Sequence, residues 1–137
     1  MKKLDLCSDE IRMLEAILSL LSERTQHSLS LDNLIEKWRR FVIETEQGYE
    51  DSIYEYTNDL SIRDILEEVL LYAPQSLRGK LAKEIEIWDI RFQKATVEAE
   101  KPLVSRLSCN LPWWWFRIPK KLAGELEADL REMGIIS

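Results

Sequence analysis

A long helical pattern between Pro74 and Thr96 limits the folds that are open to this chain. Apolar residues recur there at gaps of 4, 4, 3, 4 and 3, which is the spacing of one face of an α-helix. A helix of about 20 residues is roughly 30 Å long, enough to span a small domain. We therefore expect a central helix against which the rest of the chain packs. Its core-facing residues are Leu77, Leu81, Ile85, Trp88, Phe92 and Ala95.

Shorter apolar stripes on both sides of this segment predict further helices. Ser8 precedes the first stripe as a helix cap, and Gly48 follows the second as a left-handed stop. Ser61 and Asp64 fit a capping box, so the chain between Tyr49 and Ala73 is predicted as two helices broken at Asn58–Ser61. The expected helices, besides the central one, cover residues 8–23, 28–48 or 30–48, 53–60, 61–73 and 119–133.

The segment Val97–Lys121 has no helical period and contains three of the four prolines. It also carries the aromatic block Trp113–Phe116, whose rings would point alternately to two sides if the backbone were extended. We expect this segment to pack against the helices, with the block covering the core; docking of a ligand or a partner is the alternative. With only 4 glycines, the chain is predicted to form an all-α, single-domain bundle of five to six helices over residues 1–137.

The balance of charge narrows the classes of partner. The net charge is −6, whereas proteins that bind duplex DNA or anionic membranes gain affinity from lysine and arginine. We therefore expect no nucleic-acid and no membrane partner. The acidic residues near the N-terminus prevent an apolar signal segment there, and Cys7 and Cys109 fit reduced, partly buried thiols better than a disulfide. Both observations favour the cytoplasm.

The sequence carries no signature of catalysis. One histidine, His27, and two distant cysteines cannot build a tetrahedral metal site, and the isolated glycines form no phosphate-binding loop. Pairs of carboxylates are expected by chance in a chain with 25 acidic residues. We therefore predict no catalytic residue, no metal and no cofactor, and we expect that the protein is not an enzyme.

One stretch stands out by its charge. The residues from Phe41 to Leu60 include six acidic side chains and neither lysine nor arginine, and tyrosines lie among them. Acids steer a cationic partner and an aromatic ring supplies contact area, so this combination is typical of a protein-binding surface. The alternative is a solvated helix end whose tyrosines point into the core. The predicted partner-binding residues are Glu44, Glu46, Tyr49, Glu50, Asp51, Glu55 and Asp59.

A second set of charges flanks the apolar face of the central helix. Asp89 follows Trp88 and Arg91 precedes Phe92, so both charges lie at the border of the core. They can pair with charges on neighbouring segments, for instance Arg63 or Asp59. We interpret them as structural ion pairs that fix the register of the helices.

Four short patterns lie between Tyr56 and Pro119. They are Tyr56-x-Asn58-Asp59-Leu60-x-x-Arg63-Asp64-x-Leu66-Glu67, then Pro74-x-x-Leu77-Arg78-x-Lys80-Leu81, then Asp89-x-Arg91-Phe92-x-x-Ala95-Thr96, and the Trp-rich block Trp113–Pro119. With these patterns, Tyr54–Thr96 and the Trp-rich block resemble the small bacterial immunity proteins that accompany polymorphic toxins and contact-dependent growth inhibition toxins. The resemblance covers about a third of the chain together with this short block.

The resemblance implies a cytoplasmic inhibitor that binds one cognate toxin domain, commonly a nuclease, and blocks its active site. A nuclease presents a basic surface to its substrate, and an acidic inhibitor can occupy that surface. A non-catalytic adaptor domain, which binds a partner helix through an apolar groove lined by the Trp block, is the alternative. An enzyme that uses two carboxylates in a deep pocket is a third hypothesis.

Overall fold

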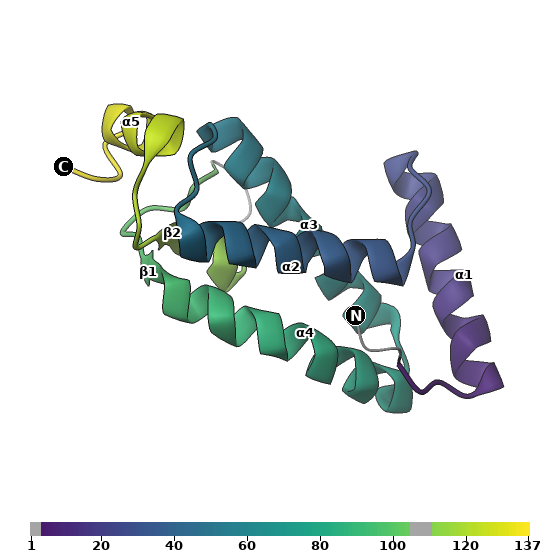
Figure 1. Ribbon diagram of the computed structural model, residues 1–137. Helices are drawn as coiled ribbons and strands as arrows, with labels where there is room; N and C mark the ends of the chain where they lie inside the picture. The colour runs from purple at the N-terminus through teal and green to yellow at the C-terminus, as the bar shows by residue number, and fades with distance from the viewer. Residues whose placement is uncertain (1–3, 105–110) are drawn as a thin grey trace.

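Three long helices enclose the core: α2 (Leu31–Gln47), α3 (Ile53–Tyr72) and α4 (Gln75–Ala95). The computed structural model describes residues 4–104 and 111–137. The helices α2 and α4 lie side by side, and α3 crosses behind them (Figure 1). The described residues form five α-helices in one all-α domain, so the predicted fold class is confirmed.

The helix α1 (Ser8–Thr25) closes one end of this layer at a steep angle (Figure 1). It begins at Ser8 as predicted, but Cys7 rather than Ser8 is the cap, because the Cys7 N–H donates to the Glu10 carboxylate at 2.9 Å. The same carboxylate accepts a hydrogen bond from Lys80 of α4 at 2.7 Å. One acidic side chain thus caps α1 and ties it to α4. Cys7 itself is exposed, contrary to expectation, and Cys109 lies outside the described residues.

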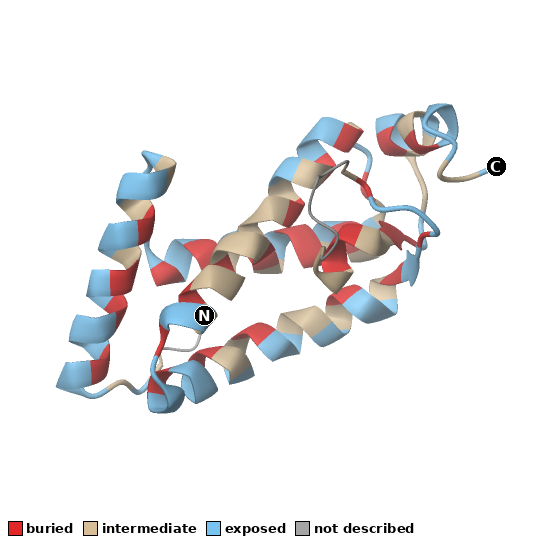
Figure 2. Ribbon diagram, turned by 180° about the vertical axis from the view of Figure 1, so that it is seen from behind, coloured by how far each residue is buried: buried red, intermediate tan, exposed pale blue. Residues whose placement is uncertain are grey.

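The core lies between the inward faces of the helices, where the buried residues gather (Figure 2). Trp38, Phe41, Tyr56 and Phe92 pack there with ring centroids 5.1–5.6 Å apart. Leu77, Leu81, Ile85 and Phe92 of the predicted stripe are buried, which confirms the central helix. Trp88 is only partly buried. Its ring lies against the guanidinium groups of Arg39 and Arg91.

The predicted break at Asn58–Ser61 is wrong, because α3 is one continuous helix. The Ser61 hydroxyl donates to the carbonyl of Asn58 at 2.6 Å, as a serine inside a helix does, instead of capping a new one. Asp64 does not complete a capping box with Ser61 in this continuous helix. Its carboxylate accepts hydrogen bonds from the indole N–H groups of Trp114 and Trp115, at 2.8 and 2.9 Å.

The aromatic block folds into the short 3₁₀-helix η1 (Trp113–Phe116), not into an extended strand. Trp114 and Trp115 are buried, so the block covers the core as predicted, although its rings do not simply alternate. Around it, β1 (Thr96–Glu98) pairs antiparallel with β2 (Arg117–Pro119), with Val97 opposite Ile118. The last helix, α5 (Gly124–Glu132), is shorter than predicted because β2 takes up Pro119.

Candidate functional site

The predicted acidic segment comprises the last turn of α2, a short connection and the first half of α3. Gly48 ends α2 with a φ of 113°, a region that favours glycine. The Ser52 hydroxyl caps α3 by accepting a hydrogen bond from the N–H of Glu55 at 3.3 Å. The Asp51 carboxylate accepts one from the N–H of Ser52 at 2.9 Å. Local hydrogen bonds therefore order the connection.

The helix α5 holds this connection by hydrogen bonds to the main chain of Glu50 and Ile53. The N–H of Glu125 donates to the carbonyl of Glu50 at 2.9 Å, and the Asp129 carboxylate accepts from the N–H of Ile53 at 2.9 Å. Gly124 makes the close approach possible, since its φ is +54° and a Cβ there would lie 2.4 Å from the Glu50 carbonyl oxygen. The connection between α2 and α3 is thus held by contacts with α5 as well as by its own local hydrogen bonds.

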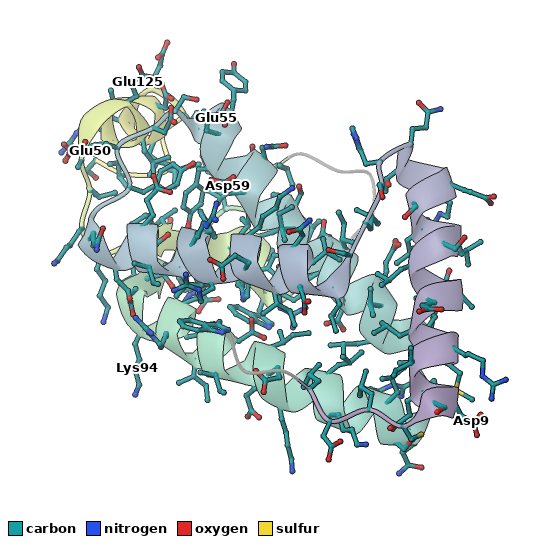
Figure 3. The ribbon with its side chains drawn as sticks, turned by 45° about the vertical axis from the view of Figure 1, so that its right-hand side comes forward. Asp9, Glu50, Glu55, Asp59, Lys94 and Glu125 are labelled. Atoms are coloured by element: carbon teal, nitrogen blue, oxygen red, sulfur yellow. The ribbon has the colours of Figure 1, made fainter. Side chains whose placement is uncertain are left out.

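Four exposed carboxylates gather at this end of the molecule. Glu50, Asp51 and Glu55 belong to the predicted set, and Glu125 joins them from α5 (Figure 3). Within residues 4–104 and 111–137, none of the four forms an ion pair. We call Glu50, Asp51, Glu55 and Glu125 the acidic surface.

Glu44 and Asp59 lie on α2 and α3, where they line a groove of about 370 Å³ between the two helices. Phe41 and Ile62 give this groove apolar walls. Two cations, Lys37 and Arg40, also line it, so its charge is mixed. The groove can accept a polar side chain, but it is not a uniformly acidic surface.

The acids of this region influence one another. Partial burial, together with the charges of Asp59 and Asp51, raises the pKa of Glu44. Burial also raises the pKa of Asp59, although the hydrogen bond from Tyr49 and the charge of Lys37 act in the opposite direction. Glu44, Asp51 and Asp59 thus form one cluster of like charge, which a cationic partner would stabilise.

Glu46 and Tyr49, two members of the predicted set, have other roles in the structure. Glu46 lies on another face of α2, where its carboxylate pairs with Arg91 of α4, and the Nε–Oε2 distance is 2.9 Å. The Tyr49 ring is 1% exposed, so it belongs to the core. Its hydroxyl donates to Asp59 at 2.8 Å and thereby holds that carboxylate in place.

Beside the acidic surface, Tyr54 reaches solvent: it is 80% exposed and lies between Asp51 and Glu55 in the sequence. It was not among the predicted site residues. The spacing of Ile53, Tyr56 and Leu60 could have shown it, because these three residues face the core and leave Tyr54 on the opposite side of α3. Glu125 could not have been found in this way, because only the tertiary fold brings α5 beside α3.

The second set of charges forms the predicted structural ion pair. Arg63 of α3 is 5% exposed and binds Asp89 of α4, with 2.9 Å between Nη2 and Oδ2 and 3.0 Å between Nε and Oδ1. The indole N–H of Trp38 donates to the same carboxylate at 3.0 Å, and the Trp114 ring lies 4.4 Å from the Arg63 guanidinium carbon. These groups hold α2, α3, α4 and η1 together, which is a structural role.

The described residues offer few groups for chemistry near the acidic surface. In the part of the chain that the structure describes, no three His, Cys, Asp or Glu side chains are placed to hold a metal ion. His27 is exposed, as expected for a loop residue. The groove places two carboxylates together, but Glu44 lies in solvent and Asp59 is engaged by Tyr49.

No family model, curated protein or solved structure matches this chain. None of the described helices is both long enough and apolar enough to cross a membrane.

Proposed function

We propose that the protein is an immunity protein that binds a cognate bacterial toxin domain, a basic nuclease, and occludes its active site. The observation that carries the proposal is the acidic surface: four carboxylates on an ordered connection and the adjoining helix ends, with no cation paired to them among the described residues. The resemblance of Tyr54–Thr96 to immunity proteins supports the same function. In this proposal the protein acts in the cytoplasm, where it meets the toxin.

The physical basis is charge complementarity. A nuclease attracts phosphate with lysine and arginine side chains, and a partner with clustered carboxylates meets the same side chains. Attraction between the charges is screened beyond about 8 Å at physiological salt. The acidic surface therefore speeds association at short range, while the contact area keeps the two proteins bound. Tyr54 supplies that area, because a tyrosine ring buries a large surface with few rotatable bonds.

The ordered backbone adds to affinity. Gly124 and the hydrogen bond from Glu125 to Glu50 fix the connection before a partner arrives. Binding then costs less conformational entropy than it would with a disordered loop. The exposed Glu44 and the half-buried Asp59 add negative charge from the neighbouring groove, whereas Glu46 is paired with Arg91 and Tyr49 is buried.

Co-expression tests this proposal. The chain would be produced together with the toxin encoded in the neighbouring reading frame, and both growth rescue and co-purification would be measured. We expect both with the wild type and neither with the triple variant E50K/D51K/E55K. The matched control is E15K/E23K/E86K, which changes the net charge equally at exposed acids elsewhere. Equal binding by the two variants, or no binding by the wild type, would contradict the proposal.

The structure gives less support to the alternative function, an adaptor domain that binds a partner helix. It requires the Trp block to line a surface groove, but Trp114 and Trp115 are buried and donate their indole N–H groups to Asp64.

A further inference from the structure

The surface next to the acidic surface has the opposite charge. A groove of about 290 Å³ near the C-terminal end of α4 is lined by one acid, four cations and an alanine. We call it the basic groove. Its residues are Glu46, Arg91, Lys94, Ala95, Lys120 and Lys121.

Three of these cations are uncompensated. Arg91 is paired with Glu46, whereas Lys94, Lys120 and Lys121 are exposed and form no ion pair within the described part of the chain. The Lys94 side chain extends outward from α4 (Figure 3). These lysines are therefore free to meet an anionic group.

The carbonyl groups at the C-terminal end of α4 are hydrogen-bonded to groups other than the three lysine side chains. The carbonyl of Ala95 accepts the main-chain N–H of Lys120 at 3.0 Å. The carbonyls of Gln93 and Thr96 accept from the Arg117 guanidinium, both at 2.8 Å. The last turn of α4 is thus satisfied by other groups, and the three ammonium groups have no structural task there.

The two surfaces meet at the end of α2. The Lys121 Cβ lies 3.8 Å from the position that a Cβ on Gly48 would take, and the backbone of Tyr49 bridges to that of Leu122. Glu50 begins the acidic surface only two residues after Gly48. The sign of the charge therefore reverses over a short distance.

We infer that the basic groove binds an acidic segment of a protein partner, in which carboxylates face Lys94, Lys120 and Lys121. A protein can place cations beside that segment, and these would face the acidic surface. A nucleic acid carries one negative charge at every step of its backbone, so a strand that leaves the groove toward the end of α2 meets Glu50 and Asp51 and is repelled. A reversal of charge thus favours protein over nucleic acid.

This inference deepens the proposed function, because it states the surface that the toxin would present: cations bordered by a carboxylate-bearing segment. The groove can nevertheless be tested without a toxin. A failed peptide experiment would count against the groove alone, and a failed co-expression would count against the inhibitor alone.

The experiment is a titration of the full ¹⁵N-labelled chain at low salt with an N-acetylated tetraglutamate amide, followed by NMR. We expect saturable shifts confined to the amides around Lys94, Ala95, Lys120 and Lys121. The variant K94Q/K120Q/K121Q should bind about fivefold more weakly or worse, the weakening expected when up to three exposed ion pairs are lost. The matched variant K37Q/K83Q/K101Q, which also removes three exposed lysines, should bind like the wild type.

Hexathymidylate serves as the second probe. Little or no shift of the groove amides with this oligonucleotide would support the assignment to an acidic protein segment. Equal or larger shifts of the same amides would overturn it in favour of nucleic acid. Absence of shifts with the peptide, or equal weakening by both triple variants, would overturn the groove as a binding site.

Discussion

Arg63 and Asp89 form a two-point ion pair between α3 and α4, with 2.9 Å between Nη2 and Oδ2. Burial raises the pKa of Asp89, while the hydrogen bonds from Arg63 and Trp38 act against that rise. The buried Asp89 charge is acceptable in this position because Arg63 is present, and the Arg63 charge is balanced by Asp89 together with the more exposed Glu67. The pair therefore matters more for the relative position of the two helices than for net stability.

Removal of one partner should be strongly destabilising. We expect Asp89→Ala to lower the free energy of unfolding by about 3–5 kcal/mol, because among the described residues it leaves the buried Arg63 guanidinium with the more exposed Glu67 as its one carboxylate partner. Urea denaturation followed by circular dichroism measures this. Glu67→Ala is the control, since Glu67 binds the same arginine from a more exposed position and should cost less than about 1 kcal/mol. A similar loss for the two variants would contradict a structural role of the buried pair.

The pH dependence of stability should reveal the raised pKa of Asp59, which is caused first by burial and then by the nearby charge of Asp51. The raised pKa of Asp59 means that the folded state binds its proton more tightly than the unfolded state does. This contribution to stability is therefore present below the unfolded pKa of 3.8 and is lost as the pH rises through the folded value. Asp59→Asn, which keeps an oxygen for the Tyr49 hydroxyl, should be more stable than the wild type at neutral pH.

The measurement is urea denaturation of wild type and Asp59→Asn at neutral pH and below pH 3.8. The advantage of the variant should shrink or vanish at the acidic value, where the wild-type carboxyl is protonated in both states. An advantage that is independent of pH, or a loss of stability at neutral pH, would rule out this account.

The two tryptophans Trp38 and Trp88 should differ in their contribution to stability. Trp38 is fully buried, so Trp38→Ala should cost about 3–5 kcal/mol through the cavity that it leaves. Trp88 was predicted from its place in the stripe to be a core residue of the same kind, which is wrong. Its ring is partly exposed beside Arg39 and Arg91, and Trp88→Ala should cost about 1–2 kcal/mol. Thermal and urea unfolding of both variants test the order.

Gly124 should tolerate no side chain. Gly124→Ala places a Cβ against the Glu50 carbonyl oxygen at positive φ, and we expect a loss of about 1–3 kcal/mol together with faster amide exchange at Glu125. Gly79→Ala in α4 is the matched control, because a Cβ there meets no atom within 4 Å. It should raise stability by about 0.5–1 kcal/mol. Equal effects of the two substitutions would contradict the close contact between α5 and the connection.

Tyr54 should matter for binding and not for folding. We expect Tyr54→Ala to weaken the complex with the co-purified toxin by at least about 2 kcal/mol, roughly thirtyfold in affinity, and to leave the unfolding curve unchanged. Isothermal titration calorimetry measures the affinity. Tyr72→Ala is the control, because Tyr72 is 51% exposed at the other end of α3. An unchanged affinity of the Tyr54 variant would remove the tyrosine from the interface.

The sequence predicts best what repeats along one helix. The stripe of α4 and the cap at Ser30 with its hydrogen bond to Asn33 follow from local spacing. The place of Asp89 at the border of the core also follows from spacing, but only the tertiary fold brings Arg63 beside it as its partner. The break in α3 was predicted wrongly because Ser61 can cap a helix or bond back within one, and packing decides between the two. The candidate site was predicted only in part, since burial of Tyr49 and the pairing of Glu46 with Arg91 depend on segments distant in the chain.

The attachment of Glu50 to α5 runs through its carbonyl oxygen, and its carboxylate takes no part. Substitutions of the side chains at positions 50 and 55 can therefore alter what the surface recognises while the helices beneath keep their places, whereas the Asp51 carboxylate also binds the N–H of Ser52. A protein built in this way can acquire a new binding preference through a few substitutions of exposed side chains, with little loss of stability.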